Sequence, residues 1–508
     1  MKLGKLIYLY DDNAISIDGG TDLAFSEDVD KRFEAYGFHC QCIADGDHDL
    51  EGIAKAIEQA QQVKDRPSLI RIKTTIGFGS ARAGTEKVHG APLGVDDLAA
   101  AKERFGMSSL KPFSVPSEVA SFYADVTAKN MEIYHQWDAR LNTFSQRHPE
   151  LAEELMRRLA KKLPDNLESL LPRYEPESAA MATRKLSENV LNAICPHVPE
   201  IMGGSADLTH SNLTKWKDSI DFQANGSSLG SYAGHYLRFG VREHAMFGIC
   251  NGLAAYGGIV PFSSTFLNFI SYGWGSVRLS ALSHQQVLYI MTHDSIGLGE
   301  DGPTHQPIET LAGLRALPNM LTFRPADGNE VSGAYLQALQ HRTCPSVLCL
   351  SRQNLPQLRG SSIHAVSHGA YILQDGSVEG KLDLILVATG SEVAIIVGAA
   401  EILQSQHRLA VRVVSMPCWE LFDRQSSEYR RSILLPSVPI VSVEALSTLG
   451  WQKYAHVCIG MTDFGLSGPY QEVYRRFGFT PEAVAAKALC TVEYYRGGPV
   501  PNLHASPF

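Results

Sequence analysis

The residues best suited to acid–base chemistry lie close together in one segment of the chain. His293 and Asp294 directly follow the apolar run 287–291, and Asp301 and His305 lie on the glycine-rich stretch after them. Ligands of open α/β sheets bind beyond the carboxyl ends of strands, which is where a strand at 287–291 would place this segment. Histidines and carboxylates there suit proton transfer and the recognition of hydroxyl groups. An ordinary polar loop is the alternative interpretation.

Glu243 is a second candidate for acid–base chemistry. It precedes the apolar run 245–255, which has the length of a helix. A carboxylate in such a place could be buried and share a proton, with a raised pKa. An acidic residue at the start of a helix is also favoured by the helix dipole alone. The pattern by itself favours this second, structural interpretation.

Two further patterns are weak when each is taken alone. Phe266, Phe269 and Tyr272 recur at every third position and would cover one side of a helix, which is typical of a hydrophobic core. Arg184 and Arg352 lie beside the ends of predicted elements, where an arginine can offer two parallel hydrogen bonds to a phosphate group. Surface arginines are mostly solvated, so neither residue indicates a phosphate site by itself.

The elements that would position these residues alternate between apolar strands and amphipathic helices, which indicates an α/β protein. The alternation forms three blocks, and a charged helical stretch lies between the first two. Strands are predicted at 6–10, 68–73, 201–203, 259–262, 287–291, 321–324, 347–350, 384–388, 410–415 and 440–443, and a helix is predicted at 51–62.

Composition argues against several classes of protein. The formal net charge is -9, whereas a nucleic-acid or anionic-membrane partner would require a basic surface. No apolar run reaches the length of a membrane helix, and no signal peptide is visible. The nine cysteines form no C-x-x-C pair, so we expect reduced thiols and a cytoplasmic protein. No complete G-x-G-x-x-G follows a strand, which disfavours a nicotinamide-dependent dehydrogenase.

Together these segments resemble the transketolase family, in order and in spacing, from residue 3 to about residue 477. The phrases that carry the resemblance are G-V-R-E-H-A at 240–245, S-T-F-L-N-F at 264–269, T-H-D-S-I-G-L-G-E-D-G-P-T-H-Q-P at 292–307, R-P-A-D-G-N-E at 324–330 and S-R-Q-N-L-P-Q at 351–357. Their wording is closer to the yeast-like and bacterial branch than to the animal branch. The resemblance implies a homodimeric, thiamine-diphosphate-dependent transferase of the pentose phosphate pathway. It would move a two-carbon ketol unit between sugar phosphates such as xylulose 5-phosphate, ribose 5-phosphate and erythrose 4-phosphate.

The fold that the resemblance implies is α/β, with three consecutive domains built on mostly parallel sheets. A diphosphate-binding domain with its linker would span 1–147, a pyrimidine-binding domain 148–362 and a C-terminal domain 363–508. The family carries a G-D-G metal motif well before the asparagine that Asn13 matches, and no such motif precedes Asn13 here. We therefore expect a truncated first domain and an incomplete catalyst.

The resemblance also assigns roles at the cofactor. Glu243 matches the glutamate that hydrogen-bonds N1′ of the aminopyrimidine and so favours the tautomer that deprotonates the thiazolium ring. Phe266, Phe269 and Tyr272 match the aromatic wall around the pyrimidine, which reverses the core interpretation. Asp207 matches a further acid of the cofactor site.

Further roles concern the metal and the substrates. Asn13 and the carbonyl of Ile15 match ligands of the Mg²⁺ or Ca²⁺ ion that holds the diphosphate. His89 matches a histidine near the diphosphate and the reacting carbon. His305 matches one that moves protons on substrate hydroxyls, and Asp301 matches the acid that contacts the donor's C2 hydroxyl. The residues that match the pocket for the sugar phosphate are Arg184, Ser211, His293 and Arg352.

Three explanations of the missing part stay open, together with one rival reaction. The chain is a fragment of a normal enzyme, a shortened binding or regulatory protein without transketolase activity, or a protein that cooperates with a separate chain. Dihydroxyacetone synthase, a relative that uses formaldehyde as acceptor, is the rival enzyme. The intact set of four phosphate-pocket residues favours a phosphorylated acceptor instead.

Overall fold

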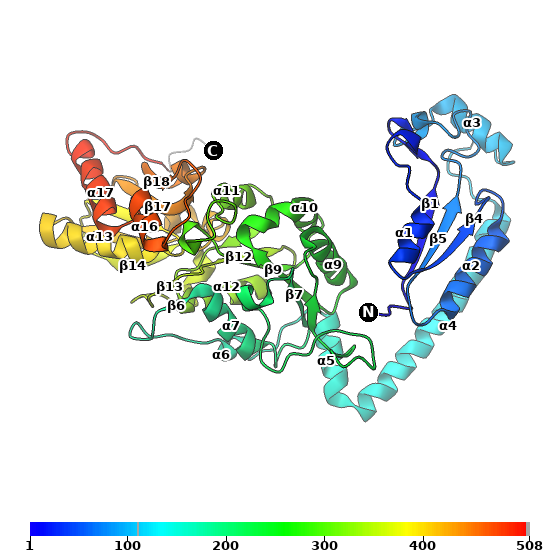
Figure 1. Ribbon diagram of the computed structural model, residues 1–508, viewed down its shortest axis with the longest axis horizontal. Coiled ribbons are helices and arrows are strands. Elements are labelled where there is room, and N and C mark those ends of the chain that lie inside the picture. The colour runs from blue at the N-terminus through cyan, green and yellow to red at the C-terminus, as the bar shows by residue number, and fades with distance from the viewer. Residues whose placement is uncertain (109–110, 504–508) are drawn as a thin grey trace. The chain divides into compact units, whose positions relative to one another are not determined.

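The computed structural model describes residues 1–108 and 111–503. The chain divides into two compact units (Figure 1). Unit 1 comprises Met1–Arg147 together with Gln223–Tyr232, and unit 2 comprises His148–Phe222 together with Ala233–Phe508.

Unit 1 is built on a three-stranded parallel sheet in the order β1-β5-β4. Ala56 and Ala60 of one helix pack on Ile70 of the central strand and form a small core. Strand β4 was not predicted, because its sequence His-Cys-Gln-Cys-Ile contains no apolar run. The elements of unit 1 are β1 (Ile7–Asp12), β2 (Ile15–Ser16), β3 (Gly19–Gly20), η1 (Thr21–Leu23), α1 (Val29–Ala35), β4 (His39–Ile43), α2 (Leu50–Gln62), β5 (Ser68–Lys73), η2 (Glu86–Val88), α3 (Val95–Arg104) and α4 (Ser117–Arg147).

Unit 2 opens with a six-stranded, fully parallel sheet in the order β11-β12-β10-β9-β7-β8. Successive side chains of a strand point to opposite faces, so Ile290 packs in one core cluster while Tyr289 and Met291 pack in another. Helices α7 and α12 contribute to the first cluster, and α9, α10 and α11 contribute to the second. Both faces of this sheet are therefore covered by helices, as an all-parallel sheet requires.

The strands of this sheet are β7 (Ile201–Ser205), β8 (Tyr236–Arg238), β9 (Val260–Phe266), β10 (Leu288–Thr292), β11 (Leu321–Phe323) and β12 (Ser346–Leu350), and a short antiparallel pair is formed by β6 (Met181–Ala182) and β13 (Asn354–Leu355). The helices around it are α5 (Pro149–Leu159), α6 (Leu167–Leu170), α7 (Thr183–Ile194), α8 (Thr209–Asn212), α9 (Glu243–Tyr256), η3 (Leu267–Gly273), α10 (Trp274–Leu282), η4 (Ile296–Leu298), α11 (Thr310–Arg315), α12 (Gly328–Gln340) and η5 (Ala365–His368).

A second sheet of unit 2 has five strands in the order β14-β16-β15-β17-β18, and only β14 is antiparallel to its neighbour. Leu386 of the central strand packs on one face of this sheet and Ile385 and Val387 pack on the other. The elements are β14 (Tyr371–Asp375), β15 (Leu384–Ala388), α13 (Glu392–His407), β16 (Val411–Ser415), α14 (Trp419–Asp423), α15 (Ser427–Ile433), β17 (Ile440–Ser447), η6 (Trp451–Lys453), β18 (Val457–Met461), α16 (Tyr470–Phe477) and α17 (Pro481–Tyr495).

The predicted fold class is confirmed, because each of the three larger sheets in the described residues is mostly or fully parallel and packs against helices. The ten predicted strands correspond to β1, β5, β7, β9, β10, β11, β12, β15, β16 and β17, with ends that differ by a few residues. Among the residues that the structure describes, no helix combines the length and the apolar character needed to cross a membrane.

Candidate active site

Most of the candidate residues gather at one edge of the six-stranded sheet. Thr292, the last residue of β10, lies opposite Phe266, the last residue of β9, and opposite Leu350, the last residue of β12. His293 directly follows the end of β10, and Arg352 lies two residues after the end of β12. Because parallel strands all end on the same side, these residues meet at the carboxyl edge where open α/β sheets bind ligands.

The aromatic residues and two histidines form one continuous group of side chains, here called the ring cluster. It consists of Phe266, Phe269, Tyr272, His293 and His305. The rings of Phe266 and Phe269 stack with centroids 5.4 Å apart, and Tyr272 lies 5.8 Å beyond Phe269. His293 stacks on Phe266 at 3.7 Å, and His305 meets Phe269 edge-on at 5.1 Å. Histidines from two loops therefore share one aromatic surface.

The local helix type explains why the aromatic residues line up. η3 is a 3₁₀ helix, which has three residues per turn, so side chains three positions apart lie on the same side. Phe266 is buried, Phe269 is half-buried and Tyr272 is 68% exposed. A row that ends in an exposed tyrosine does not close a hydrophobic core, so the core interpretation of this spacing was wrong.

Glu243 is the first residue of α9, and its side chain is half-buried. Helix η3 packs on the first turns of α9 at Gly273, where an added Cβ would lie 2.2 Å from the Phe247 ring and 3.1 Å from the Cα of His244. Within residues 1–108 and 111–503 we find no hydrogen bond or ion pair to the Glu243 carboxylate. The carboxylate is therefore available to a ligand.

Asp301 and His305 lie on one loop that is tied down from two sides. Gln306 Nε2 donates to the Leu466 carbonyl at 3.0 Å, which attaches the loop to the C-terminal part of unit 2. Asn268 Nδ2 donates at 2.7 Å to the backbone carbonyl just before His305, which attaches it to η3. These bonds hold His305 against the rings of Phe266 and Phe269, while Asp301 is exposed.

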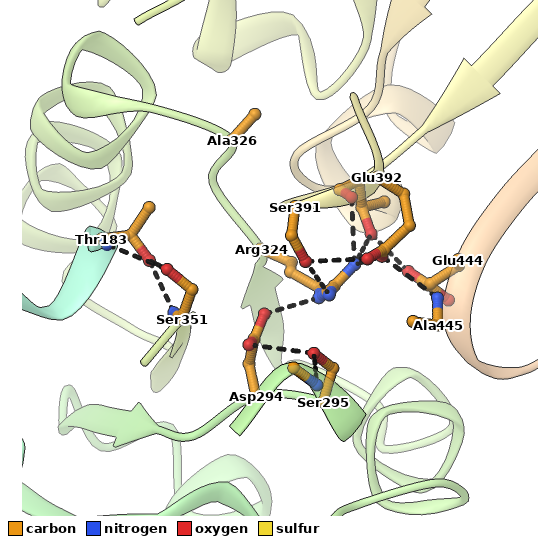
Figure 2. Close-up of polar contacts among 12 residues, drawn as sticks. Thr183, Asp294, Ser295, Arg324, Ala326, Ser351, Ser391, Glu392, Glu444 and Ala445 are labelled. Atoms are coloured by element: carbon orange, nitrogen blue, oxygen red, sulfur yellow. Dashed lines mark hydrogen bonds and ion pairs between the residues drawn. The ribbon is translucent and has the colours of Figure 1, made fainter. Parts of the chain in front are cut away.

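Two arginines are brought side by side by a pair of hydroxyl residues. Ser351 N–H donates to Thr183 Oγ1 at 2.6 Å, and the two hydroxyl oxygens lie 3.1 Å apart (Figure 2). This contact places the following residues, Arg184 and Arg352, next to each other. Arg184 Nη1 also donates to the backbone carbonyl of Ser211 at 2.6 Å. Burial and, less strongly, the Arg352 guanidinium lower the pKa of Arg184.

His293 faces the same two arginines. Burial lowers its pKa to about 3, with further contributions from Arg184, Arg352 and His305, so the imidazole is neutral at physiological pH. Its backbone lies in the left-handed region, at a φ of 61°, which costs energy for a residue with a side chain. Arg184, Ser211, His293 and Arg352 thus converge, as the sequence predicts, and we call this group the anion pocket. Two guanidinium groups beside a neutral imidazole suit a phosphate group.

A fully buried arginine connects the segment after β10 to the residues between β15 and the start of α13 (Figure 2). Arg324 Nε donates to Asp294 Oδ2 at 2.9 Å. Its two terminal nitrogens donate to Ser391 Oγ at 3.1 Å, to the Thr389 carbonyl at 3.0 Å and to the Glu392 carboxylate. Asp294 directly follows His293, so the bond from Arg324 to Asp294 helps to hold the backbone of His293 in its left-handed conformation.

Three candidate residues belong to unit 1. Asn13 follows β1, and its Oδ1 accepts a hydrogen bond from Ile15 N–H at 3.1 Å. His89 is exposed and directly follows η2. In the part of the chain that the structure describes, no group of three or more histidine, cysteine, aspartate or glutamate side chains could hold a metal ion.

Asp207 follows β7 at the carboxyl edge, where it is exposed, with a φ of 63°. β7 and β9 are paired from Ile201 to Ser205, so Asp207 lies on the same side of the sheet as Phe266. Two buried residues of the site, Asn212 and Arg324, were given no role in the prediction, although Arg324 lies in the quoted phrase R-P-A-D-G-N-E. Arg324 bonds to Asp294, and Asn212 reaches His293 through Thr292, the first residue of the phrase quoted at 292–307.

Comparison with known proteins covers nearly the whole chain. Residues 1–164 match the family described as "Transketolase, thiamine diphosphate binding domain", residues 179–357 match "Transketolase, pyrimidine binding domain" and residues 369–480 match "Transketolase-like TK C-terminal domain". Transketolase 1 of Saccharomyces cerevisiae is 53% identical over 499 residues, which are 98% of this chain and 73% of that protein. The transketolase of Scheffersomyces stipitis is 52% identical over 509 residues, which are 100% of this chain and 75% of that protein.

Solved structures of transketolases have the same fold as this chain. The crystal structure of a transketolase complex with sedoheptulose 7-phosphate from Pichia stipitis has a TM-score of 0.97 and 52% identity, and the match covers 100% of this chain and 75% of that one. The transketolase of Leishmania mexicana has a TM-score of 0.93 and 47% identity, and the match covers 98% of this chain and 73% of that one. The matches to three family models, the identity to known transketolases and the similarity of the fold show that the chain belongs to the transketolase family.

Proposed function

We propose that the protein transfers a two-carbon ketol unit from a ketose phosphate to an aldose phosphate, with thiamine diphosphate as its cofactor. The observation that carries this proposal is the shared position of His293. This residue belongs both to the ring cluster, where a flat heterocycle can bind, and to the anion pocket, where a phosphate can bind. A sugar phosphate held in the anion pocket would extend toward the ring cluster.

The residues of unit 2 fit the aminopyrimidine end of the cofactor. Thiamine diphosphate supplies a carbon nucleophile when bound, which no side chain can provide. Phe266, Phe269 and Tyr272 offer an aromatic surface that is open at its outer end. Glu243 offers a carboxylate without a protein partner among the described residues, which can accept a hydrogen bond from a ring nitrogen. We assign Asp207 to the same cofactor site.

The anion pocket fits the phosphate of the substrate. Structures of the Pichia stipitis relative are complexes with sedoheptulose 7-phosphate, xylulose 5-phosphate and fructose 6-phosphate, and we propose the same class of substrates for this chain. His305 belongs to the ring cluster, where it would move protons on substrate hydroxyls. Asp301 and His89 are assigned to the same substrate.

Replacement of Arg352 by leucine is expected to raise KM for ribose 5-phosphate by about tenfold or more. A charge-assisted hydrogen bond to phosphate contributes about 1.5–3 kcal/mol. The measurement is the initial rate against ribose 5-phosphate concentration, compared with glycolaldehyde, an acceptor without phosphate. Arg359→Leu, an exposed arginine elsewhere on unit 2, serves as the control. An equal rise in KM for both acceptors would contradict the phosphate role.

We assign the diphosphate and its metal ion to unit 1. The Asn13 side chain and the Ile15 carbonyl supply oxygen atoms, which Mg²⁺ and Ca²⁺ both accept. The hydrogen bond from Ile15 N–H to Asn13 Oδ1 shapes the turn that carries both residues, and that oxygen keeps a second lone pair for a metal. The stoichiometry of Mg²⁺ bound with thiamine diphosphate, in the protein and in Asn13→Ala, tests this assignment.

We propose that two copies of the chain associate through unit 2. Ile249 and Tyr256 project from the exposed side of α9, and Leu279 and Leu282 project from α10, which packs on α9. Gly248 and Gly252, one turn apart on α9, permit close approach of a second copy. Sedimentation at micromolar concentration should give the mass of a dimer, and a monomer under those conditions would exclude this assembly.

Domain limits and location follow from the same account. We place the diphosphate-binding domain at 1–147, the pyrimidine-binding domain at 148–362 and the C-terminal domain at 363–508, and the first of these limits coincides with the division into units. All nine cysteines are free thiols, which suits the cytoplasm.

A further inference from the structure

A chain of buried hydrogen bonds runs from the end of β7 to the imidazole of His293. Leu208 N–H donates to Ser205 Oγ at 3.1 Å, and Ser205 Oγ donates to Asn212 Oδ1 at 2.7 Å. Asn212 Nδ2 donates to Thr292 Oγ1 at 2.7 Å, and Thr292 Oγ1 lies 2.8 Å from His293 Nδ1. Ser205, Asn212, Thr292 and His293 are all at most 3% exposed, so water does not compete for these bonds.

The donors and acceptors along this chain determine its direction. A backbone N–H can only donate, so Leu208 uses a lone pair of Ser205 and the Ser205 hydroxyl hydrogen points to Asn212 Oδ1. The amide nitrogen of Asn212 must then face Thr292, and it too can only donate. The remaining hydrogen of the chain, on the Thr292 hydroxyl, is left to point at His293 Nδ1.

The opposite direction of this hydrogen-bond chain would leave one buried group without a partner. If the Asn212 amide were turned over, its nitrogen would donate to Ser205, which already accepts from Leu208. The Ser205 hydroxyl hydrogen would then lose its acceptor, and a buried polar group without a partner destabilises the fold. The observed direction leaves every member of the chain with a partner.

We propose that Asn212 is a positioning residue that, through Thr292, holds His293 in the tautomer with its proton on Nε2. Nδ1 is then an acceptor inside the protein, and Nε2–H is a fixed donor on the remaining side of the ring. That donor is available to the phosphate in the anion pocket, a step that rests on the proposed function. The tautomer itself does not rest on it.

The surroundings of His293 keep its imidazole neutral, so the tautomer determines which ring nitrogen can donate a hydrogen bond. Arg184, Arg352 and His305 disfavour the charged imidazolium, and burial does so more strongly. A histidine that stays neutral has only one N–H to offer, so the residue that selects the tautomer decides whether His293 can donate to an anion. Phe266, which stacks on the ring, offers no competing partner.

The direct test is nuclear magnetic resonance of the ligand-free full chain, labelled with ¹⁵N in its histidine rings and deuterated elsewhere. The signal of His293 is assigned by its loss in His293→Gln. Above neutral pH we expect an unprotonated Nδ1 and a protonated Nε2. A protonated Nδ1 in the wild-type chain would overturn the proposal.

Two substitutions of Asn212 by residues of nearly equal size test whether Asn212 positions His293 or only supports the fold. Asn212→Asp replaces the donor by a second acceptor, so the Thr292 hydroxyl should turn toward it and accept from His293 Nδ1–H, which inverts the tautomer. Asn212→Leu removes both groups and should give a mixture of tautomers. Unchanged signals of the other histidines show that each variant is folded. The Nε2–H tautomer persisting in both variants would refute the role of Asn212.

Kinetics of the cofactor-loaded protein then test the link to substrate. Asn212→Asp should raise KM for ribose 5-phosphate by about tenfold, the loss of one hydrogen bond, with little change in kcat. An inverted tautomer with unchanged KM would support Asn212 as a positioning residue and would contradict the phosphate role of His293. The failure of the proposal and the failure of the proposed function are therefore distinguishable.

Discussion

Glu243→Ala is expected to abolish ketol transfer and to leave the fold intact. The carboxylate begins α9 and has no protein partner among the described residues, so its removal breaks no internal hydrogen bond. A positioned acid–base group contributes about 10²–10⁴-fold to a rate. A larger loss is expected here, because every turnover requires the activated cofactor. The measurement is kcat in a coupled assay at saturating thiamine diphosphate.

Two controls isolate the role of the carboxylate. Glu243→Gln keeps the size of the side chain but loses its charge, and it should be nearly as inactive as the alanine variant. Glu482→Ala removes an exposed acid from the first turn of another helix, α17, and should keep wild-type activity. Wild-type kcat in Glu243→Ala would eliminate Glu243 as the residue that activates the cofactor.

Arg324→Leu is expected to cost about 3–5 kcal/mol of unfolding free energy, because removing one partner leaves buried charges uncompensated. Arg324 is fully buried, and the Asp294 and Glu392 carboxylates that it contacts are no more than 2% exposed. Burial raises the pKa of Asp294, and the Arg324 guanidinium opposes that shift. Without the arginine, both carboxylates would have to stay charged inside the protein without a neutralising partner or take up a proton.

Urea denaturation at neutral pH measures this loss. Arg359→Leu is the matched control, because Arg359 also pairs with a carboxylate but is 79% exposed, and exposed pairs add little stability. The midpoint of Arg324→Leu should fall far below that of the wild-type chain, while the control should hardly move. Similar midpoints for the two variants would show that the buried network does not stabilise the protein. Since Asp294 follows His293, we also expect weaker binding of phosphorylated substrates in Arg324→Leu.

The fold was largely predictable because its strands are short apolar runs. The run 287–291 is buried on both sides of a parallel sheet, and such a position favours a nearly continuous run of apolar residues. The polar residues that follow it had to lie at the carboxyl edge. β4 was missed because its residues are mixed in character: Gln41 Nε2, for example, donates to the Ala56 carbonyl of α2.

The site was less predictable, because most of its contacts join distant parts of the chain. Asn212 reaches Thr292 across 80 residues, and Arg324 reaches Glu392 across 68. The residues next to Asn212 and Arg324 in the sequence do not indicate which distant side chains these two residues will contact. The alignment of Phe269 with Tyr272 was foreseen from spacing, but the 3₁₀ geometry that leaves Tyr272 exposed was not.

The resemblance supplied what the residues alone did not, namely the roles of Glu243 and of the aromatic residues. The family is confirmed by matches over three segments of the chain. The individual roles stay predictions.

Product formation tests the central claim most directly. The purified protein is incubated with thiamine diphosphate, Mg²⁺, xylulose 5-phosphate and ribose 5-phosphate, and sedoheptulose 7-phosphate is identified by mass spectrometry. We expect this product to form together with glyceraldehyde 3-phosphate, at whatever rate the bound cofactor supports. We also expect it to require added thiamine diphosphate and to be absent with Glu243→Ala. No product from the wild-type protein, or equal product without the cofactor, would contradict the assignment of a ketol transferase.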